Sequence, residues 1–168
     1  MSNLAAARAV LERVRAAGVA DFCICGGSRN APLVAALTDG RSPLPEQPAS
    51  TANGQRSTVN VFTFVDERSA AFFALGRVKR DDRPVAVITT SGTAVAELLP
   101  AAVEAYYSGA PLVLITADRP ARFRGTAAPQ SIEQIGIFGP YAQTDADRWD
   151  KRAPLHINIE FDEPLIDE

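Results

Sequence analysis

Residues 62–76 read FTFVDERSAAFFALG, and they join a strand pattern to a helix pattern with almost no connection between the two. The aromatic and β-branched residues before Asp66 are typical of a strand, and we predict one over 59–65. The alanine-rich run that follows predicts a helix over 67–80. Asp66 can cap this helix, and Glu67 lies in its first turn, where a negative charge is favourable. A strand therefore delivers a carboxylate to the N-terminus of a helix.

The alternation of strands and helices continues along the chain. We predict further strands over 20–25, 84–90, 111–117 and 155–161, with a weak strand near 141–145, and further helices over 3–17, 30–38 and 93–107, with a short one near 130–137. Pro100 should kink or divide the helix that contains it. Strands that are apolar on both faces and alternate with helices indicate a parallel sheet covered on both sides. The predicted fold is α/β, a three-layer α/β/α arrangement with a mostly parallel sheet of about six strands.

One polar segment interrupts this alternation. Residues 40–58 are rich in Pro and Ser and lack a hydrophobic period, which is typical of a flexible surface loop. A functional lid and a tolerated insertion are both consistent with this composition, and the general variability of loops favours the insertion. The length of 168 residues is sufficient for one domain with its own core, so we expect 1–168 to form a single domain.

Composition excludes several classes of function. The formal net charge of −3 gives no support for nucleic-acid binding. No apolar run is long enough for a membrane span, and the charged N-terminal helix is unlike a signal peptide, so we expect a cytoplasmic protein. Cys23 and Cys25 are expected to be buried strand residues, because a zinc site would need two further ligands. The single histidine, His156, lies inside a strand and is expected to pack there.

The chemistry is expected at one edge of the sheet. Ligands of open parallel sheets bind beyond the carboxyl ends of the strands, and here these ends are followed by the four turns 26–30 (GGSRN), 66–68 (DER), 91–93 (SGT) and 118–120 (DRP). The first turn offers backbone N–H groups and the Arg29 fork to an anion. Each turn also has a purely structural explanation, such as Ser28 or Asp66 acting as a helix cap or Arg119 being solvated. Spacing alone leaves these alternatives open.

Five motifs together resemble a known family. GGSRNAPLVAAL, DERSAAFFALG, TTSGTAVAELLPAAVEA, LITADRP and APQSIEQIGIFG occur in the order found in the N-terminal, pyrimidine-binding domain of thiamine-diphosphate enzymes. The combination is most similar to the 2-succinyl-5-enolpyruvyl-6-hydroxy-3-cyclohexene-1-carboxylate (SEPHCHC) synthases of menaquinone biosynthesis. The resemblance runs from about residue 5 to the end of the chain. It implies a transferase that decarboxylates 2-oxoglutarate and adds the resulting four-carbon unit to isochorismate.

The resemblance also implies roles for particular residues. Glu67 matches the catalytic glutamate that hydrogen-bonds the aminopyrimidine of thiamine diphosphate, in a site kept dry by its apolar surroundings. Thr93 matches a position near the same ring. The positions that contact carboxylates of the substrate or intermediate are matched by Ser28, Arg29, Arg119 and Gln130. The cofactor carries the carbanion chemistry, and the protein tunes it.

A central domain and a diphosphate-binding domain of the family have no counterpart in this sequence. In the family the latter holds Mg²⁺ and the cofactor diphosphate through an Asp/Asn motif, so we predict no metal ligand in this chain. The chain alone is then expected to be an inactive half-site that needs a diphosphate-binding partner and that self-associates. Two alternatives remain: a subunit of another split thiamine-diphosphate 2-oxoacid decarboxylase, and a non-catalytic binding domain of the same fold.

Overall fold

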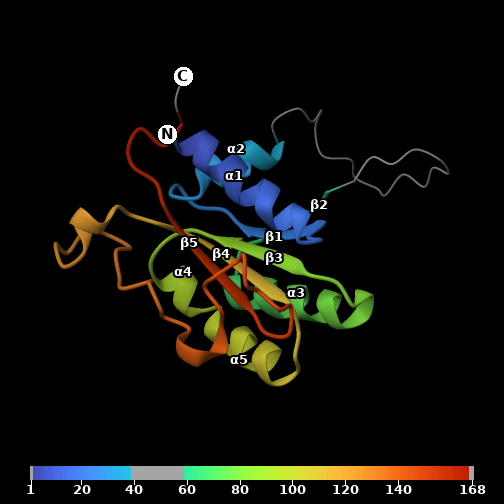
Figure 1. Cartoon of the computed structure of the whole chain (residues 1–168). Helices are drawn as coiled ribbons and strands as arrows, with labels where there is room; N and C mark the ends of the chain where they lie inside the picture. Colours follow the sequence, from blue (N-terminus) through green and yellow to red (C-terminus); the bar gives the residue numbers. More distant parts are fainter. Residues whose placement is uncertain (1, 39–58, 167–168) are drawn as a thin grey trace.

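A five-stranded, all-parallel sheet forms the centre of the protein (Figure 1). The computed structural model describes residues 2–38 and 59–166, so the loop expected over 40–58 lies outside the described residues. The strands are β1 (Asp21–Cys25), β2 (Asn60–Phe64), β3 (Val85–Thr89), β4 (Leu112–Asp118) and β5 (Leu155–Glu160), in the spatial order β2-β1-β3-β4-β5. The predicted three-layer α/β fold is confirmed.

Helices cover both faces of the sheet (Figure 1). One face carries α1 (Asn3–Ala16) and α2 (Ala31–Thr38), and the other carries α3 (Glu67–Asp81), α4 (Thr93–Ala96) and α5 (Leu99–Tyr107). Two short 3₁₀ turns, η1 (Ala121–Phe123) and η2 (Gly139–Tyr141), lie in the long segment between β4 and β5. The expected division near Pro100 is confirmed, because α4 and α5 are separate helices and Pro100 stands in the first turn of α5.

Two hydrophobic cores lie above and below the sheet. All residues of β1, β3 and β4 are buried, as a sheet covered on two sides requires. Alanines of α3 and α5 pack against one face, and such small side chains let both helices lie close to the strands. Cys23 and Cys25 are free thiols that share this core, because residues two apart in a strand face the same side.

A buried ion-pair cluster fixes α3 against the amino end of β1. Asp21 accepts hydrogen bonds from Asn60 at 2.7 Å, from Arg77 at 2.6 Å and from Arg83 at 2.9 Å. Burial alone would raise the pKa of Asp21, but these hydrogen bonds outweigh it and hold the pKa below its ordinary value. Since Arg77 lies on α3, the cluster anchors the helix whose opposite end carries Glu67.

The segment between β4 and β5 differs from the sequence-based prediction. The short helix expected near 130–137 is absent from this described segment, in which residues 131–134 are irregular and 135–138 form turns. Gln130 and Gly136 have positive φ angles of 53° and 73°, so the stretch between them is too short for a stable helix. The weak strand expected near 141–145 is reduced to one parallel bridge between Gln143 and Leu155.

The strand order places a switch point between β1 and β3. From β1 the chain moves outward to β2 and then returns across β1 to β3, so α2 and α4 leave the two central strands toward opposite faces. In open α/β sheets, ligands bind at the carboxyl ends of the strands at such a point. The turns that follow β1 and β3 are therefore the expected place for a ligand site.

Candidate functional site

The turn after β1 is stabilised by an asparagine. The side chain of Asn30 accepts a hydrogen bond from the Gly27 backbone N–H at 3.0 Å and donates one to the Cys25 carbonyl at 2.8 Å. The capping role considered for Ser28 is not observed, since its exposed hydroxyl makes no hydrogen bond with any described residue. Asn30 therefore shapes the turn and leaves the Ser28 hydroxyl available to a ligand.

The turns after β1 and β3 touch one another. A Cβ atom on Gly27 would lie 2.6 Å from the Cβ atom of Thr90, so only glycine allows this approach. Gly92 has a φ of 83°, and a Cβ atom there would lie 2.8 Å from the Cα atom of Gln130. The two glycines bring the turn after β1, the turn after β3 and the segment after β4 into direct contact.

Glu67 is the first residue of α3, immediately after the N-cap Asp66. Asp66 accepts a hydrogen bond from the Ser69 backbone N–H at 2.7 Å, so Asp66 alone performs the capping. The half-buried Glu67 side chain makes no hydrogen bond or ion pair with the described residues.

Burial, with the nearby Glu67 and Asp66 carboxylates, raises the pKa of Cys25 to about 12. This thiol stays protonated at neutral pH and is not a nucleophile.

Arg29 is occupied within the protein. Its guanidinium is buried, and it donates to the Phe161 carbonyl at 2.9 Å and to the Glu163 carboxylate at 3.0 Å. The chain around Glu163 is held in turn by Asn3, whose side-chain amide donates to the Asp162 carbonyl at 2.6 Å. Of the residues predicted to bind substrate, Arg29 is the one already paired with a carboxylate.

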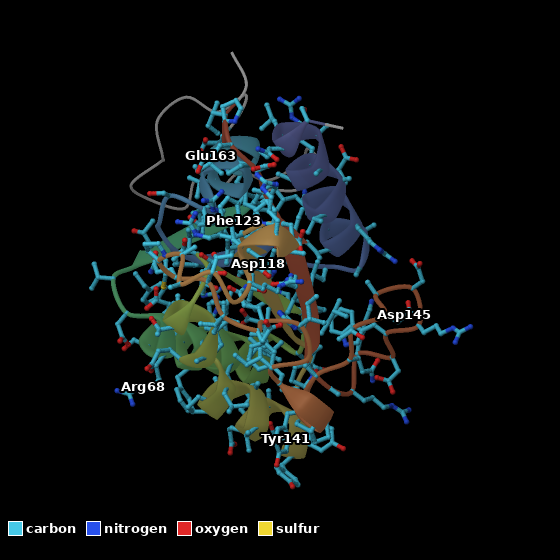
Figure 2. The ribbon with its side chains drawn as sticks, turned by 90° about the vertical axis from the view of Figure 1, so that its left-hand side faces the viewer. Arg68, Asp118, Phe123, Tyr141, Asp145 and Glu163 are labelled. Carbon is cyan, nitrogen blue, oxygen red and sulfur yellow. The ribbon has the colours of Figure 1, made fainter. Side chains whose placement is uncertain are left out.

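Asp118 organises the end of β4. Its carboxylate accepts hydrogen bonds from the Arg119 backbone N–H at 2.7 Å, from Asn158 at 2.9 Å and from Arg124 at 3.2 Å. Figure 2 faces the side of the molecule where the segment after β4 projects, and it shows Asp118 and Phe123 near the centre of that side. The Arg119 side chain lies against the Phe123 ring and donates through Nε to the Pro129 carbonyl at 2.8 Å. Its two Nη groups remain without a hydrogen-bond partner among the described residues.

Sequence reasoning missed Gln134 because it placed this residue in a helix. Gln134 is fully buried, and its side-chain amide contacts Gly92, Ala117 and Asn158. A polar residue with this degree of burial could have been recognised only by its position within an otherwise apolar stretch, QIGIFG, which is a weak signal. The partners of its amide are set by tertiary structure.

His156 is packed as expected. Its Nε2 atom lies 2.8 Å from the Thr116 hydroxyl, and its ring meets the Phe138 ring edge-on with centroids 4.7 Å apart. Burial lowers the pKa of His156 to about 4, so the ring is neutral at physiological pH. A structural role in the sheet fits this environment better than acid–base chemistry.

The predicted site residues thus fall into one neighbourhood with two kinds of environment. Ser28, Thr93 and Gln130 are exposed and their side chains have no hydrogen-bond partner among the described residues, as is also true of half-buried Glu67. Arg119 and Arg29 are partly or fully held by the protein. Unpaired polar groups at a switch point are available for a ligand.

Over residues 2–38 and 59–166, no group of three or more His, Cys, Asp or Glu side chains is arranged to hold a metal ion. Within the same residues, no helix combines the length and apolarity that crossing a membrane requires.

A parallel sheet with unpaired polar side chains at its switch point defines a ligand-binding α/β domain. Residues 4–137 match the family described as "Thiamine pyrophosphate enzyme, N-terminal TPP binding domain". The chain belongs to this family, and the resemblance recognised in the sequence is confirmed.

Curated relatives carry the same name as the family inferred from the motifs. The chain is 44% identical to the SEPHCHC synthase of Bdellovibrio bacteriovorus over 99% of its own length and 31% of that protein. It is 46% identical to the enzyme of Akkermansia muciniphila (88% and 27%) and 44% identical to that of a Nocardioides species (98% and 29%). The chain therefore spans about a third of the length of these relatives, which are larger proteins.

Proposed function

We propose that this chain is the pyrimidine-binding part of a SEPHCHC synthase, which decarboxylates 2-oxoglutarate and transfers the four-carbon unit to isochorismate. The observation that carries this proposal is Glu67, a carboxylate at the start of α3 with no partner among the described residues, in a chain similar to SEPHCHC synthases over nearly its whole length. Residues 1–168 would form one domain, and the central and diphosphate-binding domains would belong to another part or another chain of the enzyme. The reaction would take place in the cytoplasm.

The residues present fit the aminopyrimidine of thiamine diphosphate. Glu67 has no competing partner among the described residues. The Cys25 thiol is close enough for the Glu67 charge to raise its pKa, and the buried Ala71 lies one helical turn after Glu67 on α3. When bound, the cofactor supplies the centre that stabilises a carbanion. Glu67 would hold a proton between its carboxylate and a ring nitrogen, and its partly buried position limits competition from water. Thr93 stands at the start of α4, where its exposed hydroxyl can contact the same ring.

The substrate carboxylates would be bound by the groups that remain free. Arg119 has two unpaired Nη groups in a planar fork, the geometry that suits a carboxylate. The Ser28 hydroxyl and the Gln130 amide can add hydrogen bonds from the neighbouring turns. Arg29 can join them by exchanging the Glu163 carboxylate for a carboxylate of the substrate.

A partner would complete the site. Mg²⁺ and the cofactor diphosphate would be held by the diphosphate-binding part, which the larger relatives have the length to contain. Apolar side chains are exposed beside the site residues: Val65 precedes Asp66, and Ile135 follows Gln134. Exposed apolar side chains of this kind are typical of surfaces that contact another protein. Docking of the diphosphate-binding part, and self-association of the complex, would cover them.

The decisive experiment is a reconstitution assay with a Glu67→Gln variant. The chain is mixed with a separately produced C-terminal portion of a SEPHCHC synthase, thiamine diphosphate and Mg²⁺, and isochorismate-dependent CO₂ release from 2-oxoglutarate is measured. We expect turnover in the mixture only, and a loss of about 100-fold or more in kcat for Glu67→Gln. Glu12→Gln, an exposed change on α1, is the matched control and should leave turnover unchanged.

Two outcomes would count against the proposal. Full turnover by Glu67→Gln would remove the catalytic role of this residue. An inactive mixture in which both portions are folded and associated would exclude 2-oxoglutarate and isochorismate as the substrate pair, and the assay would then be repeated with other 2-oxoacids.

A further inference from the structure

The side chain of Gln134 makes three hydrogen bonds, each to a different part of the candidate site. Its Oε1 atom accepts a hydrogen bond from the Gly92 backbone N–H at 2.8 Å. Its Nε2 atom donates to the Ala117 carbonyl at 3.1 Å and to the Asn158 side-chain oxygen at 2.9 Å. The residue is fully buried. One amide group thus connects the turn after β3, the end of β4 and strand β5.

The amide orientation of Gln134 is fixed by its neighbours. The Asn158 side-chain oxygen also accepts a hydrogen bond from the Thr116 hydroxyl at 2.8 Å, and the Asn158 amide donates to Asp118 at 2.9 Å. Because Asp118 only accepts, the amide of Asn158 must point its nitrogen toward Asp118 and its oxygen toward Gln134. Gln134 therefore presents Nε2 to Asn158 and Oε1 to Gly92.

Gly92 is enclosed between two parts of one segment. Its N–H bonds to the Gln134 side chain, and its Cα atom packs against the backbone of Gln130 so closely that a Cβ atom would lie 2.8 Å away. The residue before Gln130, Pro129, accepts the hydrogen bond from Arg119. A displacement of the Gly92 turn would therefore also displace Thr93, Gln130 and Arg119.

We propose that Gln134 is a positioning residue, which holds the turn after β3 in register with the segment that carries Arg119 and Gln130. This inference rests on the proposed function for its catalytic consequence. Gln134 does not touch the ligand. It acts through Gly92, so that Thr93 on one side and Arg119 and Gln130 on the other face the ligand in one fixed arrangement.

Amide hydrogen exchange tests the contact directly. In Gln134→Met, which keeps the side-chain length but removes the hydrogen bonds, exchange at the Gly92 amide should rise about tenfold or more, while amides in the middle of β3 keep their rates. Gln143→Met is the matched control, since the Gln143 amide bonds only to exposed Asp150 and lies outside the site.

Hydrogen exchange of side-chain amides in the unmodified chain tests the same contact without requiring a variant to fold. The side-chain amide protons of Gln134 should exchange about tenfold or more slowly than those of Gln143. The Gln134 amide is fully buried and donates two hydrogen bonds, whereas the Gln143 amide donates one, to the exposed Asp150. Equal exchange at the two amides, or unchanged protection of Gly92 in a folded Gln134→Met variant, would overturn the proposal. Neither result depends on whether the chain supports turnover.

Kinetics in the reconstituted complex separate positioning from general destabilisation. Gln134→Met should raise KM for isochorismate about tenfold, because Arg119 and Gln130, which would bind substrate carboxylates, are displaced. The kcat value should fall less than about twofold, since Glu67 lies on α3 outside this network. A fall of about tenfold in kcat with an unchanged KM would overturn the assignment of Gln134 as a positioning residue. An inactive wild-type mixture would refute the proposed function. The hydrogen-exchange measurements would still decide whether Gln134 holds the Gly92 turn.

Discussion

At the scale of single residues, His156 shows how burial determines protonation. The chain has one histidine, so its titration is free of overlap with others of its kind. Its ring lies between Thr116 and Phe138, and burial lowers its pKa from 6.5 to about 4. The unfolded chain takes up this proton as the pH falls below about 6.5, whereas the folded chain does not do so until the pH approaches 4.

The folded state should therefore lose stability on mild acidification. Because the unfolded state binds more protons in this window, the free energy of unfolding should fall by about 2 kcal/mol between pH 7 and pH 5. Urea denaturation at these two pH values measures the change. Asp66 and Asp81 have lowered pKa values and titrate below the window. In His156→Gln the change should be much smaller, and an NMR titration that gave His156 a pKa near 6.5 would contradict the assignment.

At the scale of elements, the contact between the turns after β1 and β3 depends on one glycine. Gly26 and Gly27 are adjacent, yet only Gly27 faces a neighbour: a Cβ atom there would lie 2.6 Å from Thr90, whereas a Cβ atom on Gly26 would meet nothing within 4 Å. The backbone itself must shift to admit a side chain at Gly27, because the atom in the way is the Cβ of Thr90. The pair is a natural matched comparison.

Gly27→Ala should lower the free energy of unfolding by about 2 kcal/mol, as overpacking in a close contact does. Gly26→Ala should stay within about 0.5 kcal/mol of the wild type. Urea denaturation of both variants measures the difference. Equal changes in the free energy of unfolding for the two substitutions would contradict this prediction. They would show that the turns after β1 and β3 can separate enough to admit a Cβ atom at Gly27.

The same scale shows what the sequence could and could not predict. The strand and helix around Asp66 follow from local signals, a β-branched run and a cap, and their predicted bounds agree with β2 and α3 to within one residue. The stretch near Gln134 was wrongly assigned to a helix, because its conformation depends on hydrogen bonds to Gly92 and Asn158, which are remote in sequence. The convergence of the turns follows from parallel strands, whereas the pairing of Arg29 with Glu163 joins residues 134 positions apart, which no local pattern indicates.

At the scale of the whole molecule, the candidate site lies beside exposed apolar side chains such as Val65 and Ile135. In the proposed function Glu67 would contact a ring and Arg119 a carboxylate, but the described residues hold no group of three metal-ligating side chains. A cofactor that carries a diphosphate needs its negative charge compensated by a metal ion or by basic groups. The contacts available here would supply only part of the binding free energy, and a second portion of the enzyme would supply the rest.

Affinity for thiamine diphosphate should therefore depend on assembly and on Mg²⁺. By isothermal titration calorimetry, we expect the chain alone to bind the cofactor with a Kd weaker than about 1 mM, and the mixture with a C-terminal portion of a SEPHCHC synthase to bind about 100-fold more tightly or better. Removing Mg²⁺ with EDTA should abolish the tight binding of the mixture and leave the weak binding of the chain unchanged, because the metal would be held by the partner. Micromolar, EDTA-sensitive binding by the chain alone would show that this chain holds the metal and the diphosphate itself, and the half-site account would then be wrong.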